Sequence, residues 1–194
     1  HLLYLDVLSQ DDSKRSEMRD AFNTAVDKAP VPELFHQAAT FNLKSRARNQ
    51  AIKTLEKGIA LMPEESRFHT RLASLLVEMQ RRSKAIEHLK TAIELNPKSA
   101  NAYSLLGELK RAEGASTLKE SESYLRTAVE LVPQDPIHVA RLAELLLTRA
   151  QVENDVAADL RKETRTMLKR VLKDEWRAAE AFFQMAILER LENG

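Results

Sequence analysis

Hydrophobic positions along the chain recur at helical spacing, and proline interrupts them at regular intervals. Residues 89–97 (Leu-Lys-Thr-Ala-Ile-Glu-Leu-Asn-Pro) have the pattern of an amphipathic helix that stops at Pro97, and closely similar segments stop at Pro63 and Pro133. Proline ends a helix because it lacks a backbone N–H and disfavours helical geometry in the residue before it. These prolines stand 34 and 36 residues apart. A period near 34 built from two helices predicts an array of helical repeats.

Each repeat of this period is expected to pair a first helix with a second, so the prolines divide the chain into units. Residues 1–31 are predicted to be an N-terminal helix or partial repeat, residues 32–65, 66–99 and 100–135 three regular units, residues 136–178 an extended and degenerate unit, and residues 179–194 a C-terminal half-repeat or capping helix. The predicted architecture is therefore all-α.

Turn and capping residues mark two of the expected boundaries. Gly114 opens a loop before Thr117 and Glu120, whose spacing is typical of a capping box at the start of a helix. Asp135 followed by Pro136 is typical of another helix start, with a capping side chain and then proline at the first helical position.

The fourth unit departs from the period. Trp176 stands where its terminal proline is expected, and the unit holds nine more residues than the 34-residue period. We expect longer helices on both sides of residues 151–154 to take up the difference.

Composition and charge narrow the class of protein. Hydrophobic residues make up 43% of the chain and charged residues 30%, while aromatic residues make up only 5%, which disfavours β-rich folds. The 30 basic and 29 acidic residues give a net charge of +1, which argues against a dedicated nucleic-acid surface. No apolar run approaches the roughly 18 residues that span a bilayer, so no direct membrane insertion is expected. The chain has no cysteine and hence no disulfide or thiolate chemistry.

The recurring positions resemble the tetratricopeptide repeat. In that family a large residue stands at the fourth and eleventh positions, and Leu and then Gly or Ala stand at the seventh and eighth. Ala recurs at the twentieth and twenty-seventh positions, a large apolar residue stands at the twenty-fourth, and Pro stands at the thirty-second. The second and third units match at Leu72, Ala73, Leu76, Ala85, Leu89, Ala92 and Pro97, and at Tyr103, Leu106, Gly107, Leu125, Ala128 and Pro133. Departures are Asn42, Lys110 and Glu189 at the eleventh position, Ser121 at the twentieth, Gly58 at the twenty-seventh and Trp176 for the proline.

This resemblance implies a right-handed α-solenoid of antiparallel helix pairs, a TPR superhelix of about four to five repeats. An unrelated helical bundle with prolines at similar spacing is the alternative. Pentatricopeptide repeats, which bind RNA, fit less well, because the proline-terminated second helix and the basic RNA-facing positions are not both present.

Residues that could carry catalysis or hold a metal are scattered. No two of the five histidines are spaced i, i+4, and no His-Glu-x-x-His sequence occurs. The four glycines are isolated, so a phosphate-binding loop is absent, and there is no Gly-x-Ser-x-Gly sequence. We therefore predict no catalytic, cofactor or metal site. His69 is expected to be a packed core side chain.

The first helices carry the candidate binding residues. The resemblance implies that these helices line a concave, partner-binding groove, whose candidate residues are His36, Thr40, Arg67, Arg71, Asn101, Glu108, Arg111, Arg141 and Glu144. The arginines from three successive repeats (Arg71, Arg111, Arg141), expected to face solvent, could bind carboxylates of an extended, mildly acidic segment, while Asn101 could bond its backbone. Alternatively, Glu108 and Glu144 on the same helices already pair with those arginines.

The predicted function is a non-enzymatic scaffold that binds a peptide segment or a partner protein in this groove. Because the chain begins with His1 in mid-pattern, we expect it to be part of a larger protein or assembly, in a compartment that the sequence does not specify. The alternative is a regulatory or substrate-presenting domain of an enzyme. The last helix has more apolar residues than one buried stripe needs, among them Phe182 and Phe183, so self-association through it is a further expectation.

Overall fold

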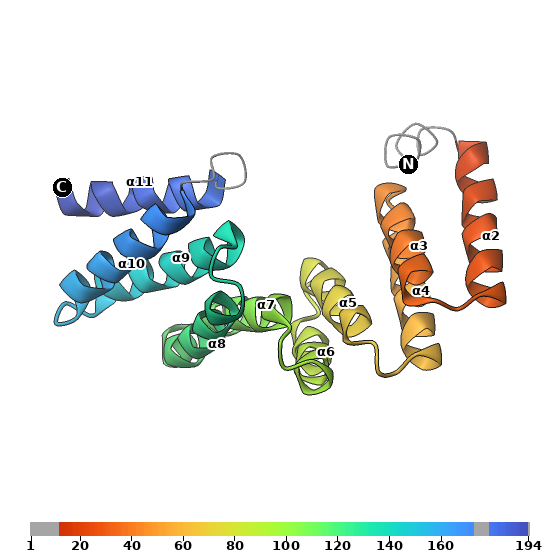
Figure 1. Ribbon diagram of the computed structural model, residues 1–194, viewed down its shortest axis with the longest axis horizontal. Coiled ribbons are helices and arrows are strands. Elements are labelled where there is room, and N and C mark those ends of the chain that lie inside the picture. Colours follow the sequence, from red (N-terminus) through yellow and green to blue (C-terminus); the bar gives the residue numbers. More distant parts are fainter. Residues whose placement is uncertain (1–11, 173–178, 194) are drawn as a thin grey trace. The chain divides into compact units, whose positions relative to one another are not determined.

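The computed structural model describes residues 12–172 and 179–193, and every regular element in these ranges is a helix (Figure 1). The elements are α2 (Asp12–Lys28), α3 (Pro32–Lys44), α4 (Arg48–Leu61), α5 (Ser66–Glu78), α6 (Arg82–Leu95), α7 (Ala100–Arg111), the short 3-10 helix η1 (Ala115–Thr117), α8 (Leu118–Leu131), α9 (Pro136–Val152), α10 (Ala157–Val171) and α11 (Ala179–Asn193). The all-α prediction is confirmed. Residues 1–11 of the predicted N-terminal helix or partial repeat and the position of Trp176 lie outside the described residues.

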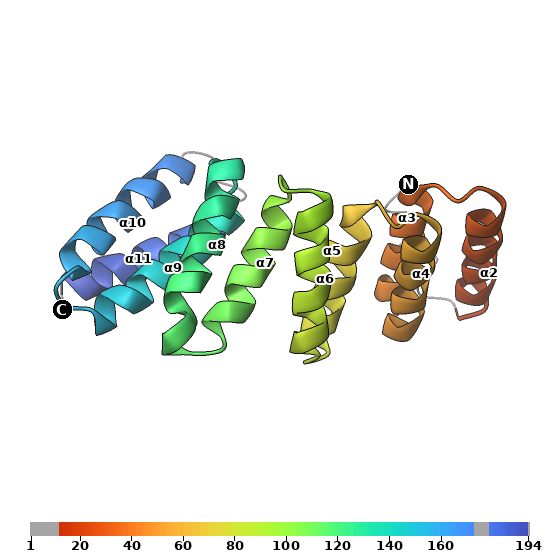
Figure 2. The same cartoon turned by 90° about the horizontal axis from the view of Figure 1, so that it is seen from below.

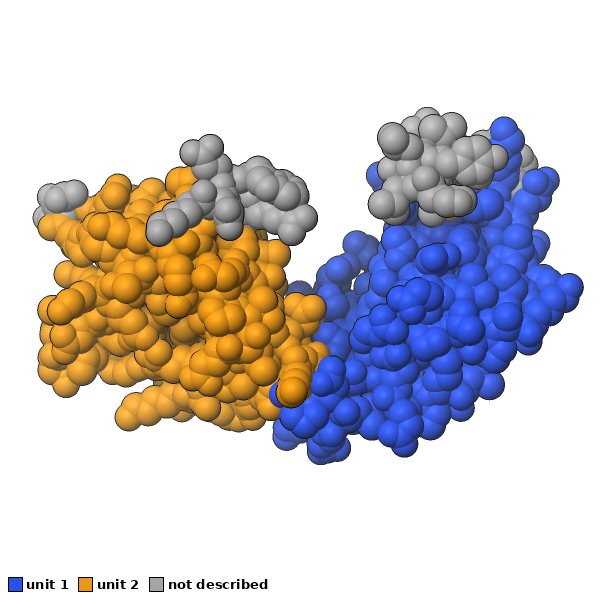
Figure 3. All heavy atoms as spheres, viewed as in Figure 1, with its two compact units in different colours: residues 1–97 blue, residues 98–194 orange. Residues whose placement is uncertain are grey.

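The chain forms two compact units, residues 1–97 and residues 98–194 (Figure 3). In the first unit each helix from α2 to α6 contacts the next, and α3 with α4 and α5 with α6 form antiparallel pairs. In the second unit α7 pairs with α8 and α9 with α10, while α11 packs on α9 and α10. Four helix pairs flanked by α2 and α11 give a fold of about five repeats, as the proline period predicts.

Aromatic side chains dominate the core of the first unit. Phe35, Phe41 and Phe68 are fully buried together with leucines of α4, α5 and α6. The rings of Phe35 on α3 and Phe68 on α5 meet edge to face at 5.8 Å between centroids. Burying one such side chain contributes about 1.5–3 kcal/mol, so these contacts fix successive first helices against one another.

Helix α9 is the centre of the second unit. It contacts α7, α8, α10 and α11 and buries nine residues, which include Val139, Leu142, Leu145 and Leu146. A helix covered on most sides is apolar on most sides. At 17 residues it is longer than the 13-residue α5, and α10 with 15 residues slightly exceeds the 14-residue α6. The predicted lengthening is confirmed for α9, whereas α10 is close to the length of the other second helices.

Both predicted helix starts are confirmed, because Thr117 precedes α8 and Asp135 precedes α9, but only Asp135 makes the predicted side-chain cap. The Asp135 carboxylate accepts hydrogen bonds from the backbone N–H of Ile137 at 2.9 Å and of His138 at 3.3 Å. Thr117, by contrast, makes no capping bond, and its hydroxyl donates to the carbonyl oxygens of Lys110 at 2.6 Å and Gly114 at 2.9 Å. The cause is backbone geometry: Thr117 has φ −105 and ψ 2 instead of the extended conformation that aims a capping oxygen at the helix.

The outer face of α11 carries exposed aromatic side chains. Ala181 and Leu188 are buried against the second unit, whereas Phe182 and Phe183 are 47% and 64% exposed. The described structure contains one chain, so self-association through this face stays a prediction.

Candidate functional site

In the first unit the candidate residues lie on α3 and α5, where a short chain of hydrogen bonds joins the two helices. The Arg71 guanidinium donates to the hydroxyl of Thr40, and that hydroxyl donates to the carbonyl oxygen of His36 at 2.7 Å. Arg71 is half-buried, and this burial lowers the pKa of its guanidinium. Among the described residues, no carboxylate lies within ion-pair distance of Arg71. Its charge is therefore not neutralised by the residues around it.

Arg67, one turn before Arg71 on α5, is fully paired. Its guanidinium binds the carboxylate of Glu65 at 2.9 Å and that of Glu33 at 3.2 Å. Glu65 also caps α5 by accepting from the backbone N–H of Arg67. The hydrogen bond from the Arg67 side chain is the main reason why the pKa of Glu65 is lowered. Arg67 thus fastens α3 to the start of α5 and is a weak candidate for an external ligand.

His36 is packed between the aromatic core and these arginines. Its ring lies 4.8 Å from the ring of Phe68, and its Nε2 is buried without a hydrogen-bond partner. Burial, followed by the positive charges of Arg71 and Arg67, lowers the pKa of His36. The imidazole is therefore neutral near pH 7, and the positive charge of this site comes from Arg71.

The second unit repeats the contrast between a paired and an unpaired arginine. Arg111 binds the carboxylates of Glu108 at 3.3 Å and Glu144 at 3.1 Å. Burial acts to lower the pKa of Arg111, but the two carboxylates outweigh it and the pKa is raised. Arg141 instead donates to the hydroxyl of Ser104 at 2.8 Å and, among the described residues, meets no carboxylate. The alternative of internal pairing therefore holds for Arg111 and not for Arg141.

The exposure of Arg71 and Arg141 differs from the sequence-based expectation. Both were expected to face solvent, yet both are half-buried, because each guanidinium turns back to a hydroxyl of the preceding first helix. Ser104, the partner of Arg141, is fully buried (0% exposed). Asn101, by contrast, is exposed in the first turn of α7.

A histidine pair that the sequence did not predict joins α5 to α6. The Nδ1 atoms of His69 and His88 lie 3.0 Å apart, and His69 is only 8% exposed, which confirms that it is a core residue. One ring donates to the other, so a neutral pair forms one hydrogen bond. In the parts of the chain that the structure describes, no third His, Cys, Asp or Glu joins such a group to complete a metal site.

Acidification should destabilise the fold, because four histidines are buried in their neutral form. Burial is the largest cause of a lowered pKa at His36, His69, His88 and His138, against an ordinary value of 6.5. The unfolded chain then binds more protons than the folded chain below pH 6.5, so stability is fully present above that pH and falls as the pH drops below it. Urea unfolding measured stepwise from about pH 7.5 to 5 tests this, with His69→Gln/His88→Gln expected to flatten the dependence. A wild-type stability independent of pH would contradict it.

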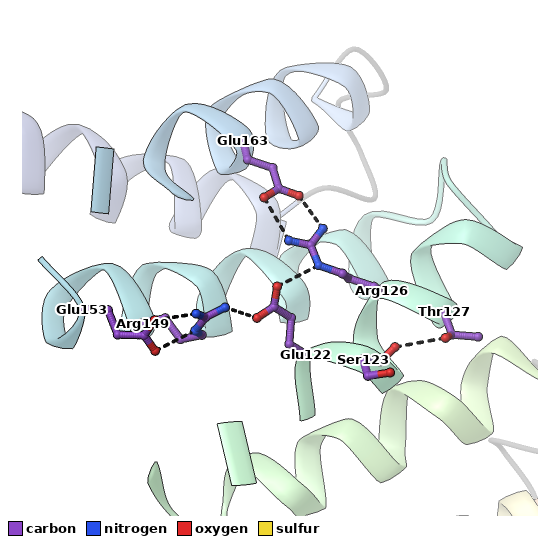
Figure 4. A network of polar contacts seen from close by, with 7 residues as sticks. All are labelled: Glu122, Ser123, Arg126, Thr127, Arg149, Glu153 and Glu163. Carbon is purple, nitrogen blue, oxygen red and sulfur yellow. Dashed lines mark hydrogen bonds and ion pairs between the residues drawn. The ribbon is translucent and has the colours of Figure 1, made fainter. Parts of the chain in front are cut away.

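A larger polar network in the second unit joins α8, α9 and α10 (Figure 4). Arg149 lies between Glu122 and Glu153, and Arg126 lies between Glu122 and Glu163. Each of the two arginines pairs with carboxylates on both sides along this chain of ion pairs, so we assign the network to holding three helices together.

None of the described helices is both long enough and apolar enough to span a bilayer.

Stacked antiparallel helix pairs, with cations of the first helices bridging successive repeats, define a helical repeat protein. Residues 43–109 of the chain match the tetratricopeptide repeat family. Its members generally mediate protein–protein interaction.

Solved structures of TPR proteins have a similar fold. The thermophilic TPR protein TTC0263 of Thermus thermophilus is 20% identical, with a TM-score of 0.67 over 97% of this chain and 97% of that one. YrrB, described as a TPR protein with an unusual peptide-binding site, is 15% identical, with a TM-score of 0.63 over 90% of this chain and 85% of that one.

A curated relative is much longer than this chain. The Protein O-mannosyl-transferase Tmtc1 of Drosophila melanogaster is 31% identical over 98 residues, which is 50% of this chain and 11% of that protein. The chain thus matches about a tenth of the relative's length.

Proposed function

We propose that each of the two units binds an extended, mildly acidic protein segment on the first helices of its own repeats, and that Arg71 in the first unit and Arg141 in the second bind carboxylates of such a segment. One observation carries the proposal. Within the described residues, these two arginines of the candidate set have no carboxylate partner, whereas Arg67 and Arg111 each have two. Each unit contributes one such arginine.

An unpaired, half-buried guanidinium favours the binding of an anion. Removing a cation from water is unfavourable unless an opposite charge compensates it, and hydroxyl groups such as those of Thr40 and Ser104 supply only a dipole. Guanidinium has five N–H donors in a planar fork, so a bond to one hydroxyl leaves donors for a carboxylate. Charge-assisted bonds of this kind are roughly twice as strong as neutral ones.

The candidate residues that already form ion pairs then adjust the charge of the surface and do not bind the ligand themselves. Arg111 pairs with Glu108 and Glu144 and offsets one of their two negative charges, which weakens their repulsion of an acidic segment near Arg141. Asn101, exposed on α7, is free to bond a peptide backbone. The proposed specificity is therefore for isolated carboxylates and not for a dense acidic tract.

The test is selection from a displayed library of random 12-residue peptides, followed by affinity measurement on the enriched peptides. We expect enrichment of Asp and Glu and at least tenfold weaker binding by Arg71→Gln/Arg141→Gln, which removes both charges but keeps an amide donor for Thr40 and Ser104. Lys90→Gln/Lys162→Gln is the matched control, since both lysines are exposed on second helices. Unchanged affinity of the arginine variant, at an unchanged melting temperature, would overturn the proposal.

A second candidate function follows from the match to the O-mannosyl-transferase. In that case the same surface would present an acceptor polypeptide to a catalytic domain elsewhere in a longer protein. O-mannosylation attaches the sugar to a hydroxyl, so the selected peptides would then be rich in Ser and Thr and not in Asp and Glu. The one selection experiment therefore separates the two functions.

A further inference from the structure

The first unit has a second cationic feature, away from Arg71, at the turns inside its two helix pairs. The turn between α3 and α4 and the turn between α5 and α6 lie at the same end of this unit, the lower end in Figure 2. Five cations stand on or beside these turns, and we call them the basic edge: Arg46, Arg48, Arg81, Arg82 and Lys84.

The two turns have the same backbone geometry, which fixes the cations in equivalent places. Arg46 and Gln80 both have positive φ, 57 and 60. In each turn the next backbone N–H then closes back on the first helix, from Ala47 to the carbonyl oxygen of Asn42 and from Arg81 to that of Leu76, both at 2.8 Å. These bonds are those of a Schellman motif, so the turns are ordered and not loose loops.

The basic edge is exposed and poorly compensated. All five cations are exposed. Only Arg48 has an acidic neighbour, Glu78 at 3.6 Å, and both side chains of that pair are more than half exposed. Within the described ranges, the other four cations make no ion pair. Most of the positive charge of the basic edge is therefore not compensated by described acidic residues and can interact with an external anion.

The location of these cations is unfavourable for the helices that carry them. Helices α4 and α6 both begin at the basic edge, have no acidic residue in the first turn and lack a side-chain cap. A helix N-terminus already carries partial positive charge, so Arg48, Arg82 and Lys84 add like charge to it. An external anion would turn this repulsion into attraction. That consideration, independent of the exposure, also favours an acidic ligand.

We propose that the basic edge is a second docking surface, separate from the surface proposed above, and that it binds an acidic segment of a protein partner. The turns carry no aromatic side chain on which a nucleic-acid base could stack and no exposed large apolar side chain that could enter a bilayer. Arginine forks suit carboxylates. Equivalent turns are two helices apart, about 20 Å at 8–10 Å per helix contact. An extended segment spans that length in about six residues.

Fluorescence anisotropy with a labelled peptide of ten glutamates tests the proposal. The triple variant Arg46→Glu/Arg81→Glu/Arg82→Glu should bind at least tenfold more weakly than the wild type, and wild-type binding should weaken steeply between about 20 and 200 mM salt. The variant should melt no earlier than the wild type, because Arg82→Glu places a carboxylate at the start of α6, where it is favourable.

The control Lys28→Glu/Lys53→Glu/Lys90→Glu makes the same change in net charge at exposed lysines of the first unit away from the edge. If both triple variants weaken binding equally, only net charge matters and the proposal fails. Binding of vesicles with anionic headgroups, or of a single-stranded RNA, in preference to the peptide and through the same three residues would also overturn it.

The proposals for the two docking surfaces can be tested independently of each other. Arg71→Gln/Arg141→Gln should leave decaglutamate binding intact, while the edge variant should leave binding of the library-selected peptides intact.

Discussion

Replacing Gly107 with valine should lower the free energy of unfolding by about 2–3 kcal/mol. Gly107 on α7 faces Leu125 on α8, and a Cβ built on it would lie 2.7 Å from the Cγ and 2.9 Å from the Cδ2 of that side chain. Leu125 is fully buried, so it has no free space to move into. The backbone oxygen of Ser121 would lie at 3.2 Å on the same side. The helices must therefore separate or Leu125 must leave its rotamer.

Valine is the informative substitution because its effect on helix propensity and its effect on packing have opposite signs. Glycine is about 1 kcal/mol worse than alanine inside a helix and valine roughly 0.6, so propensity alone predicts a slight gain in stability. Asn101→Val, at an exposed position of the same helix, measures the effect of a β-branched side chain on stability without a contact to Leu125. Thermal and urea unfolding of both variants tests the expectation. Equal melting temperatures would mean that α7 and α8 can separate at little cost.

Replacing Arg149 with methionine should lower the free energy of unfolding by about 2 kcal/mol. The side chains of Arg149 and Glu122 are only 12% and 13% exposed, and Arg149 binds Glu122 on one side and Glu153 at 2.5 Å on the other. Methionine keeps most of the length and apolar contact but leaves Glu122 nearly buried with Arg126 as its remaining partner, at 2.8 Å. That remaining ion pair is why the expected loss is smaller than for a fully orphaned charge.

Arg48→Met is the matched control, because its pair with Glu78 is 3.6 Å long and largely exposed, and such pairs contribute roughly 0–1 kcal/mol. The double variant Glu122→Gln/Arg149→Met should recover part of the loss, since it removes the uncompensated charge together with its partner. A double variant whose loss equals the sum of the two single losses would show that Glu122 and Arg149 do not interact in solution.

The sequence by itself determined the architecture, because the repeat is a local property. Prolines at a period near 34 follow the second helices α4, α6 and α8 and end them without help from the rest of the chain, and the apolar spacing between them decides which face is buried. The same locality made the cap at Asp135 predictable, since its partners are the next two N–H groups along the chain. The capping box at Thr117 failed because the backbone geometry there turns the hydroxyl away from α8, and it donates instead to carbonyl oxygens before it, one of them on the preceding helix α7.

Only the tertiary structure decided which arginines lack a carboxylate partner among the described residues. Arg71, Arg111 and Arg141 all stand on first helices, and the sequence left open which of them pair with Glu108 and Glu144. The ion pair from Arg111 to Glu144 spans two repeats, and its formation depends on how closely the first helices of those repeats approach. The contact between His69 and His88 depends in the same way on the approach of α5 to α6. Distances of this kind arise from packing across helices, because side chains far apart in sequence meet only after the repeats have stacked.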